Sequence, residues 1–317
     1  MNSPVCIIGG GAVGSVLAYF LYRSGFTRIP AYYGSEESVE AVSRLGGVFV
    51  TKVALAERIL VPVVPRHYTN PVDECEIVFN VVKAYDVEKT VDLMHRITMP
   101  HGIIVMLQNG FGSLELVREL LGGLFRVVGG VVYFGAERKS RVEVLYHGGN
   151  TVIVGCEKGV YSELLDLSSK LRLGGLDFRV VGDVDYYRWL KLALNAVVNP
   201  ITALARSRNR IVLEDEGRVL AKIILEEVSL AARKFGYSLD VEGLLRYVLR
   251  NVEQVSDNVS SMAQDIISGR KTEIDYINGF VARLLGDEGK VNAAITLLVK
   301  LLEKALKHNI VVNSKLS

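Results

Sequence analysis

The glycine-rich segment near the N-terminus places the strongest constraint on the fold. An apolar run, "VCII", precedes Gly9-x-Gly11-x-x-Gly14, and a helical pattern follows over residues 13–24. In this context the first glycine permits a tight turn, the second lets the backbone approach a pyrophosphate, and the third lets the helix pack on the strand. The N–H groups at the start of the helix then face the anion. The segment predicts a Rossmann-type dinucleotide-binding domain, and the alternative is a glycine-rich turn without a ligand.

The rest of the chain divides into two parts of different character. Short β-rich runs alternate with helical patterns up to about residue 182, and "EIVFNVVK" (76–83) has the nearly continuous apolar character of a parallel strand buried on both faces. We therefore predict an α/β fold, with a doubly wound sheet in residues 1–182, an all-helical domain in residues 183–317, and a ligand cleft between them. Helices are expected at 13–24, 86–96, 113–121, 184–206, 213–235, 240–255, 258–268, 272–285 and 290–307.

The charge balance and hydropathy exclude several classes of protein. The 317 residues include 37 Lys and Arg and 35 Asp and Glu, a net charge of +2, and no basic block stands out, so nucleic acid is not an expected partner. No uncharged apolar run approaches the ~18 residues that a membrane-spanning helix needs. The N-terminus runs directly into a strand-like segment, without the features of a secretory signal. We therefore expect a cytoplasmic protein that does not associate with membranes.

The cysteines and histidines show no arrangement typical of a cross-link or a metal site. Cys6, Cys75 and Cys156 are odd in number and widely spaced, so we expect neither a disulfide framework nor a CxxC pair. Cys6 and Cys156 lie in apolar strand-like runs and are interpreted as small buried side chains. The five histidines are scattered, and no metal is expected.

A helical segment in the second half, "RWLKLALNAVVNPITAL" (188–204), carries Lys191, Asn195 and Asn199 at intervals of four residues. At about 100° per residue, the three positions fall within roughly 80° of one helix face. Such a stripe either faces water or lines a cleft, and two observations favour the cleft. Asparagine is a poor helix former with little reason to recur on a solvated face. In addition, Pro200 leaves a backbone carbonyl one turn earlier without its helical donor.

Polar residues also follow two predicted strands of the first domain. "VVKAYD" and "LQNGFG" place Lys83 and Asn109 at the carboxyl ends of strands, where open α/β sheets bind ligands. Asn-Gly also forms turns on its own, so a turn is the alternative explanation for Asn109. Further along, the segment "NVSSMAQDIISGRKTEIDYING" contains four polar residues among apolar ones, namely Asn258, Ser261, Glu273 and Asn278.

Together these segments resemble the ketopantoate reductase family, whose members reduce 2-dehydropantoate to pantoate on the way to coenzyme A. The resemblance covers nearly the whole chain and is carried by "GGGAVG", "VKAYD", "LQNGFGS", "KLALNAVVNPITAL" and "NVSSMAQDI…RKTEIDYINGF". The last two segments keep their order and spacing and are the most specific. The resemblance implies a Rossmann-type N-terminal domain joined to a helical C-terminal domain like that of 6-phosphogluconate dehydrogenase.

The resemblance also implies roles for individual residues. The family's catalytic lysine matches Lys191, which would protonate the C2 carbonyl oxygen as NADPH delivers hydride to C2, and Glu273 is the second catalytic candidate. A lysine can donate that proton near neutral pH only if burial lowers its pKa. The expected substrate contacts are Asn109, Lys191, Asn195, Asn199, Asn209, Asn258 and Ser261. The expected cofactor contacts are Gly9, Gly10, Gly11, Ala12, Val13, Gly14, Lys83, Asn109, Ala136 and Glu273.

The choice between NADPH and NADH depends on the end of the second predicted strand, "AYYGSEES". The basic residue with which the family meets the 2′-phosphate falls near Gly34, where this chain has no basic side chain. Ser35 could bind a phosphate and Glu36 a ribose, or both could form a solvated turn. We expect NADPH from the resemblance, with NADH as the alternative.

Ketopantoate is the expected substrate and (R)-pantoate the expected product, in the biosynthesis of pantothenate. Two alternatives stay open: a related two-domain dehydrogenase acting on another 2-oxo or hydroxy acid, and a non-catalytic sensor that binds NAD(P). The long apolar helices near the C-terminus could bury a homodimer interface or form core.

Overall fold

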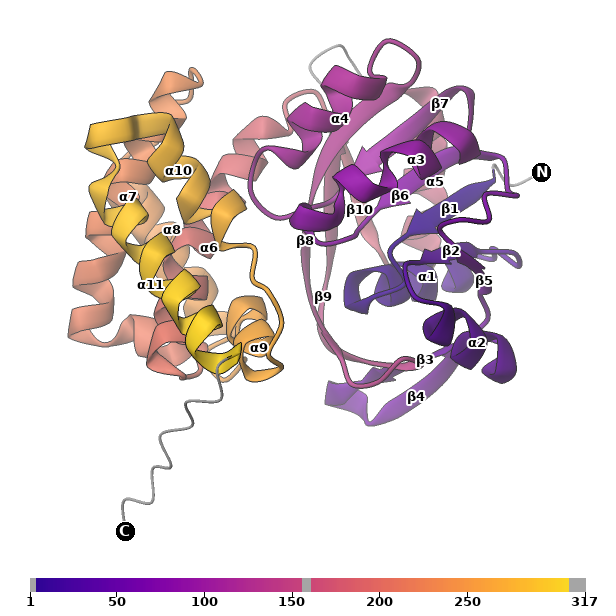
Figure 1. Ribbon diagram of the computed structural model, residues 1–317, viewed down its shortest axis with the longest axis horizontal. Coiled ribbons are helices and arrows are strands. Elements are labelled where there is room, and N and C mark those ends of the chain that lie inside the picture. Colours follow the sequence, from indigo (N-terminus) through magenta and orange to yellow (C-terminus); the bar gives the residue numbers. More distant parts are fainter. Residues whose placement is uncertain (1–3, 156–160, 308–317) are drawn as a thin grey trace. The chain divides into compact units, whose positions relative to one another are not determined.

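The computed structural model describes residues 4–155 and 161–307, and Cys156 lies outside this range. The chain divides into two compact units (Figure 1). Unit 1 comprises Met1–Gln108 and Gly112–Arg188, and unit 2 comprises Asn109–Phe111 and Trp189–Ser317. Unit 1 is an α/β structure of Rossmann type and unit 2 is helical, which confirms the predicted fold class.

Unit 1 is built on one ten-stranded sheet. The strand order is β4-β3-β9-β8-β7-β6-β1-β2-β5, and β10 pairs with β9. The pairs β3–β4 and β8–β9 are antiparallel, and the central strands from β8 through β7, β6, β1 and β2 to β5 are parallel. The bounds are β1 (Val5–Ile8), β2 (Pro30–Tyr33), β3 (Val48–Lys52), β4 (Glu57–Val61), β5 (Val64–His67), β6 (Cys75–Asn80), β7 (Thr98–Met106), β8 (Arg126–Arg138), β9 (Glu143–Gly155) and β10 (Asp177–Val181).

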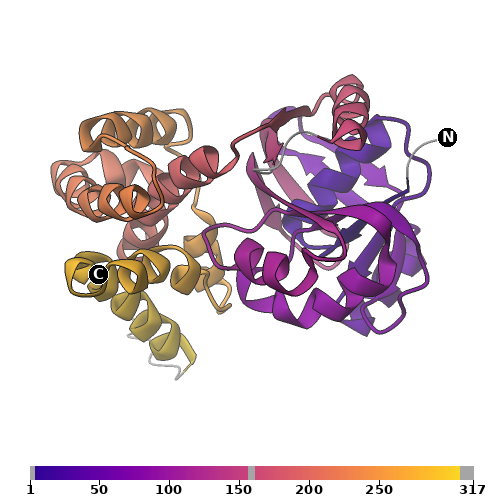
Figure 2. The same ribbon diagram turned by 90° about the horizontal axis from the view of Figure 1, so that it is seen from above.

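Helices cover both faces of this sheet (Figure 2). Successive side chains of a strand point to opposite faces, so the neighbours Ile103 and Ile104 of β7 belong to two different cores. Helices α1 and α5 pack on the core that contains Ile103, and α3 and α4 pack on the one that contains Ile104. The helices of unit 1 are α1 (Ala12–Arg23), α2 (Glu36–Leu45), α3 (Val91–Ile97), α4 (Ser113–Leu121) and α5 (Ser162–Leu173), with 3-10 turns at Val53–Leu55, Ala84–Asp86 and Glu88–Thr90.

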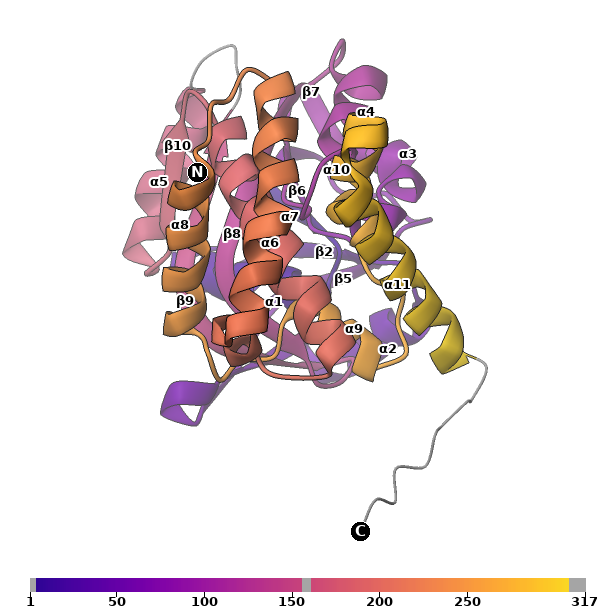
Figure 3. The ribbon, with the colours of Figure 1, turned by 90° about the vertical axis from the view of Figure 1, so that its left-hand side faces the viewer.

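Unit 2 is a group of helices around one apolar core. Helices α10 and α11 lie side by side, as do α7 and α8 (Figure 3). The core includes Trp189, Val228, Val248 and Val281. Among the described residues, none of the helices has both the length and the apolar composition to cross a bilayer. The helices are α6 (Asp185–Ala205), α7 (Asp215–Lys234), α8 (Val241–Gln254), α9 (Ser261–Ile267), α10 (Asn278–Leu285) and α11 (Lys290–Lys307), with 3-10 turns at Asn209–Leu213, Ile274–Tyr276 and Gly286–Glu288.

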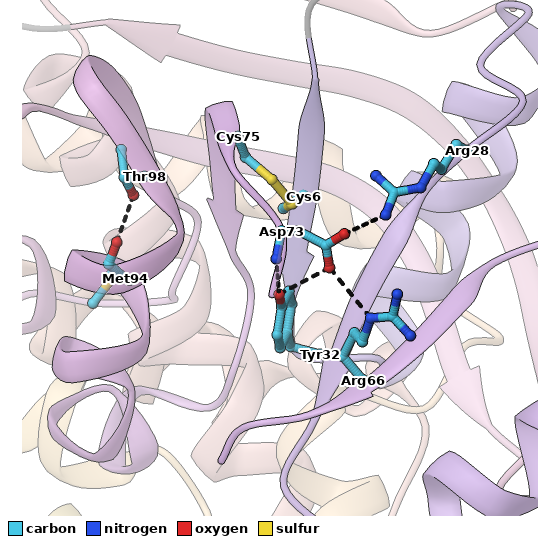
Figure 4. Close-up of a disulfide and its surroundings, with 8 residues drawn as sticks. All are labelled: Cys6, Arg28, Tyr32, Arg66, Asp73, Cys75, Met94 and Thr98. Atoms are coloured by element: carbon cyan, nitrogen blue, oxygen red, sulfur yellow. Dashed lines mark hydrogen bonds and ion pairs between the residues drawn. A yellow bond between two sulfur atoms is a disulfide. The ribbon is translucent and has the colours of Figure 1, made fainter. Parts of the chain in front are cut away.

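Cys6 and Cys75 form a disulfide, so the expectation that no cysteines are cross-linked is wrong (Figure 4). The two residues are 69 positions apart in the sequence, but β1 and β6 are neighbouring parallel strands, which brings their Cα atoms to 5.9 Å. Both side chains are buried, as the sequence predicts for Cys6. The bond lies near the amino ends of these strands, away from the glycine-rich turn that follows Ile8.

A charge cluster centred on the buried Asp73 carboxylate lies beside the disulfide (Figure 4). The Asp73 carboxylate accepts a hydrogen bond from the Tyr32 hydroxyl at 2.9 Å and forms ion pairs with Arg28 and Arg66. Burial, reinforced by Asp73, raises the pKa of Tyr32 to about 12. The two arginines compensate a carboxylate that would otherwise be costly to bury, at the same edge of unit 1 as the disulfide.

Candidate functional site

The glycine-rich turn follows β1 and leads into α1, as the sequence predicts. Gly9 has φ of +109°, and a Cβ on Gly14 would overlap the Gly9 carbonyl oxygen, so the fold itself requires glycine at these two positions. Gly11 differs, because a Cβ there would meet no described atom within 4 Å. Packing does not explain the glycine at position 11, and the open space next to the start of α1 suits a bound pyrophosphate.

Two amides organise the strand ends next to this turn. Gln108, just after β7, donates from Nε2 to the carbonyl oxygen of Asn80 at 3.0 Å and to its Oδ1 at 2.9 Å. Asn80 is fully buried, and its Nδ2 donates to Thr90 Oγ1 at 2.8 Å. These bonds fix the segment after β6, where Lys83 precedes a 3-10 turn. The sequence analysis did not single out Asn80 or Gln108, although each is a polar residue inside or next to an apolar strand.

The end of β2 leaves limited room for a side chain at position 34. A Cβ on Gly34 would come within 3.0 Å of the Tyr68 ring. Ser35 is the N-cap of α2, where its Oγ accepts the Ser38 N–H at 3.2 Å, so the solvated turn considered from the sequence is in fact a helix start. A positive charge does reach this region, because Arg138 of β8 donates to Ser38 Oγ at 3.2 Å.

Ala136, the remaining cofactor candidate in unit 1, also lies on β8. It pairs with Tyr146 of β9 and packs against the core that contains Ile103. Ala136 and Arg138 alternate with Glu137 along the strand, so both point to the same face of β8.

The stripe of polar residues on α6 belongs to unit 2. Asn195 and Asn199 are buried, and Lys191 is partly exposed. Burial lowers the pKa of Lys191 to about 8, from an ordinary value of 10.5. Desolvation disfavours the charged ammonium, so the proton of Lys191 is more readily released than that of a solvated lysine.

A chain of side-chain hydrogen bonds links α6 to the Glu273 segment. Asn195 donates from Nδ2 to Asn109 Oδ1 at 3.2 Å, and Asn109 donates from its own Nδ2 to Glu273 Oε2 at 3.2 Å. Three residues from distant parts of the sequence are thereby brought into direct contact. Glu273 is buried, and it immediately follows Thr272, whose N–H and hydroxyl both donate to Glu303 of α11.

Asn109 reaches these partners because the short segment 109–111 packs within unit 2. The Phe111 N–H donates to the Tyr276 carbonyl at 3.0 Å. Gly110 has φ of +80°, and a Cβ there would overlap that same carbonyl oxygen. The Phe111 ring lies 4.7 Å from the Trp189 ring and 5.0 Å from the Phe280 ring, measured between centroids. The Asn-Gly pair lies in a bend with positive φ at Gly110, and this bend directs the Asn109 side chain to Asn195 and Glu273.

The other predicted substrate residues form a separate group. Asn209 is buried, and its Nδ2 donates to the Val255 carbonyl at 3.0 Å. Its backbone N–H donates to the Asn258 carbonyl at 2.9 Å. Ser261 is exposed at the start of α9, whereas its neighbour Ser260 is buried and caps that helix. Ser260 also shares a hydrogen bond of 2.6 Å with Thr202 of α6, which ties α9 to the carboxyl end of the stripe.

Most of the predicted residues fall into three groups, and Lys191, Asn199 and Ser261 lie elsewhere in unit 2. The glycine-rich turn, Lys83 and Ala136 lie in unit 1. In unit 2 Asn109 contacts both Asn195 and Glu273, and Asn209 and Asn258 are in contact with each other. Over residues 4–155 and 161–307, no group of three or more His, Cys, Asp or Glu side chains is arranged to hold a metal ion.

Comparison with known proteins decides the family. Residues 5–159 match the model for ketopantoate reductase PanE/ApbA, and residues 183–305 match the model for its C-terminal domain. The chain belongs to the ketopantoate reductase family. It is therefore an oxidoreductase of this family, which acts in the biosynthesis of pantothenate.

Individual ketopantoate reductases match over nearly their full length. The chain is 30% identical to 2-dehydropantoate 2-reductase of Archaeoglobus fulgidus over 307 residues, which cover 95% of this chain and 98% of the relative. It is 32% identical to the Pyrobaculum aerophilum enzyme of the same name, with 93% and 96% covered. A solved structure of D-mandelate dehydrogenase with NADH and anilino(oxo)acetate matches with a TM-score of 0.86 at 22% identity, covering 96% of this chain and 99% of that one. That likeness shows the fold that the family shares.

Proposed function

We propose that this protein reduces 2-dehydropantoate to (R)-pantoate, with Lys191 as the general acid. The observation that carries the proposal is the lowered pKa of Lys191, about 8, on the same helix as two buried asparagines. An ordinary lysine holds its proton too tightly to serve as an efficient acid near neutral pH, and burial corrects this. The family membership supplies the substrate class, a small 2-oxo acid.

The residues of unit 2 would divide the work as follows. As the C2 carbonyl oxygen gains negative charge, the Lys191 ammonium stabilises it and transfers one proton to it, leaving a neutral amine. Asn195 and Asn199 orient the carbonyl and the hydroxyl of the substrate without adding charge to the site. Asn209, Asn258 and Ser261 are proposed to contact the rest of the substrate, with the Ser261 hydroxyl on the carboxylate. Glu273 holds Asn109, and through it Asn195, in a fixed orientation.

The cofactor is proposed to bind at the glycine-rich turn of unit 1. A nicotinamide dinucleotide there would supply the hydride for C2. The open space at Gly11 and the N–H groups at the start of α1 fit its pyrophosphate. The other proposed contacts are Gly9, Gly10, Ala12, Val13, Gly14, Lys83 and Ala136 in unit 1, and Asn109 and Glu273 in unit 2. Under this proposal residues 1–182 bind the dinucleotide and residues 183–317 bind the substrate, so catalysis needs both.

NADPH is the proposed form of the cofactor, with NADH as the alternative. A side chain at position 34 would make a tight contact with the Tyr68 ring. Arg138 instead brings a guanidinium group to Ser38 in the first turn of α2, next to the end of β2. A guanidinium group there could pair with a 2′-phosphate.

Steady-state rates with four 2-oxo acids test the substrate. We expect kcat/KM for ketopantoate to exceed that for 2-oxoisovalerate, oxaloacetate and phenylglyoxylate by more than about a hundredfold, because the site's polar groups would be left unpaired by an acid that lacks the hydroxyl. Comparable values for ketopantoate and one of the others would reject the assignment in favour of a related dehydrogenase. Absence of turnover with all four, together with tight dinucleotide binding, would favour a sensor.

We also propose a cytoplasmic homodimer. Helices α7 and α11 expose apolar side chains that a second copy could cover. Among them are Val219, Leu297 and Leu301, which are 60%, 62% and 61% exposed. Sedimentation equilibrium of the purified chain would distinguish a dimer from a monomer, and a monomer at micromolar concentration would reject this part of the proposal.

A further inference from the structure

The backbone of α6 lacks one hydrogen-bond donor in the turn that carries the polar stripe. Pro200 lies inside this helix and has no N–H, so it cannot donate to the carbonyl four residues earlier, which belongs to Ala196. Ala196 directly follows Asn195 and lies between Lys191 and Asn199. A gap in the helical bonding therefore falls within the turn that carries Asn195 and Asn199.

Asn278, the first residue of α10, supplies a donor at this position. Its Nδ2 donates to the Ala196 carbonyl at 2.9 Å and to Asn292 Oδ1 at 2.9 Å. Asn278 and Asn292 are both completely buried. A side chain from another helix thus replaces the N–H that Pro200 lacks.

Further contacts fix the orientation of the Asn278 amide. Glu227 of α7 accepts the backbone N–H groups of Val291 and Asn292, both at 2.8 Å, at the start of α11. A carboxylate can only accept, so the Asn292 side chain must turn its Nδ2 to Glu227, which it does at 2.7 Å. Asn292 then presents Oδ1 to Asn278, and Asn278 must donate in return. The Glu227 carboxylate therefore determines which atom of the Asn278 amide is the nitrogen and which is the oxygen.

This arrangement has a cost that packing alone does not explain. Within the described part of the chain, the Oδ1 of Asn278 is buried and has no hydrogen-bond partner. An unpaired buried oxygen is destabilising, and an apolar side chain of the same size would avoid it. The amide at position 278 therefore contributes what a leucine could not, namely its two bonds, to Asn292 Oδ1 and to the Ala196 carbonyl, and the second of these reaches α6.

We propose that Asn278 is a positioning residue for the reaction, which holds the Lys191–Asn199 turns of α6 in register with the Glu273 segment. The same two segments also meet through Asn109, which contacts Asn195 on one side and Glu273 on the other. Asn278 acts through the backbone of α6 and does not touch the substrate. The inference rests on the proposed function, because that function gives α6 the acid and the substrate-orienting amides.

A cycle of two substitutions tests this role. In Asn278→Leu the Ala196 carbonyl loses its donor, and we expect kcat to fall about 30-fold through misplacement of α6, with the cofactor Kd within about twofold of the original. In Pro200→Ala the new backbone N–H can serve the Ala196 carbonyl directly. The kcat of the double variant should therefore be at least about tenfold higher than that of Asn278→Leu. Pro200→Ala alone should change kcat little.

Three controls make the result decisive. All rates are measured well below each variant's Tm, with the 2-oxo acid that the unsubstituted enzyme reduces fastest, so failure of the ketopantoate assignment leaves this test valid. Asn251→Leu removes another asparagine that donates to a helix carbonyl, that of Tyr247 in α8, and should leave kcat unchanged. If Asn278→Leu does not fold, Asn278→Ser in both backgrounds provides the same comparison. A folded Asn278 variant with kcat within twofold of the original, or a loss that Pro200→Ala does not restore, would overturn the proposal.

Discussion

Unit 1 and unit 2 each contain a buried polar region. In unit 1 the Asp73 carboxylate contacts two arginines and a tyrosine hydroxyl next to the Cys6–Cys75 disulfide. In unit 2 burial lowers the pKa of Lys191 to about 8. Both regions bury polar groups among apolar side chains. In the first, burial and the hydrogen bond to Asp73 hold the tyrosine proton in place, since together they raise the pKa of Tyr32 to about 12. In the second, burial makes a proton easier to release. The difference separates a polar cluster that stabilises the fold from one suited to proton transfer.

The substitution Lys191→Ala should have the largest effect. Loss of the general acid is expected to lower kcat by about 10²–10⁴-fold, with the dinucleotide Kd unchanged. Stopped-flow reduction and a fluorescence titration with NADPH measure the two quantities. Lys222→Ala, which removes an exposed lysine that pairs with Glu242, is the matched control and should retain full activity. Turnover of Lys191→Ala at the original rate would exclude Lys191 as the acid.

The glycine-rich turn allows a matched pair of substitutions within unit 1. Gly14→Ala forces a Cβ into the Gly9 carbonyl and should destabilise the protein by about 1–3 kcal/mol. Gly11→Ala meets no described atom, so its Tm should stay within a few degrees of the original, while the dinucleotide Kd rises about tenfold because the backbone can no longer approach the pyrophosphate. Thermal melts and titrations would show the two effects separately. If Gly11→Ala leaves the Kd unchanged, the turn does not bind the dinucleotide as proposed.

Arg138→Ala should have a smaller and more selective effect. We expect kcat/KM for NADPH to fall about tenfold through loss of a charge-assisted contact, and the value for NADH to stay the same. Arg44→Ala removes an exposed arginine near the other end of α2 and is the control. An equal loss with both coenzymes would indicate that Arg138 has a structural role and does not select the 2′-phosphate.

Removal of the disulfide should affect stability and leave catalysis intact. Because the bond closes a long loop between β1 and β6, Cys6→Ser should lower the free energy of unfolding by about 2–4 kcal/mol. The amino ends of these strands lie away from the proposed cofactor turn, so kcat well below the Tm should stay the same. Denaturant unfolding with and without reductant measures the first quantity. A substantial loss of kcat in the folded variant would contradict the division of roles between the two regions.

Much of the fold could be predicted from local patterns. The glycine spacing identified β1 and α1, and helical patterns identified the helices of unit 2, although the single helix expected at 272–285 is a 3-10 turn followed by α10. Helices α2 and α5 were missed, although in α5 Leu164, Leu167 and Leu171 carry the expected spacing on its buried face. The disulfide was missed for a different reason. Sequence spacing does not reveal that β1 pairs with β6, and that pairing is what brings Cys6 to Cys75.

The same distinction applies to the candidate site. The four-residue spacing placed Lys191, Asn195 and Asn199 on one face of a helix, because helix geometry is local. The contact of Asn109 with Glu273 joins residues 164 positions apart, and only tertiary packing creates it. Pro200 indicated that a carbonyl in α6 would need a donor, but the identity of that donor, Asn278, depended on how α10 packs.

The pH dependence of the hydride-transfer step tests the central claim most directly. The ammonium form of Lys191 is the acid, and its pKa is lowered to about 8, so the single-turnover rate of reduction should be constant below that pH and fall as the pH rises through it. Rapid-mixing experiments with saturating ketopantoate and NADPH from pH 6 to about 10 would measure it. A tenfold decrease per pH unit above about 8, absent in Lys191→Ala, is the predicted result. A rate that stays constant to about pH 10 would contradict the assignment of Lys191 as the proton donor.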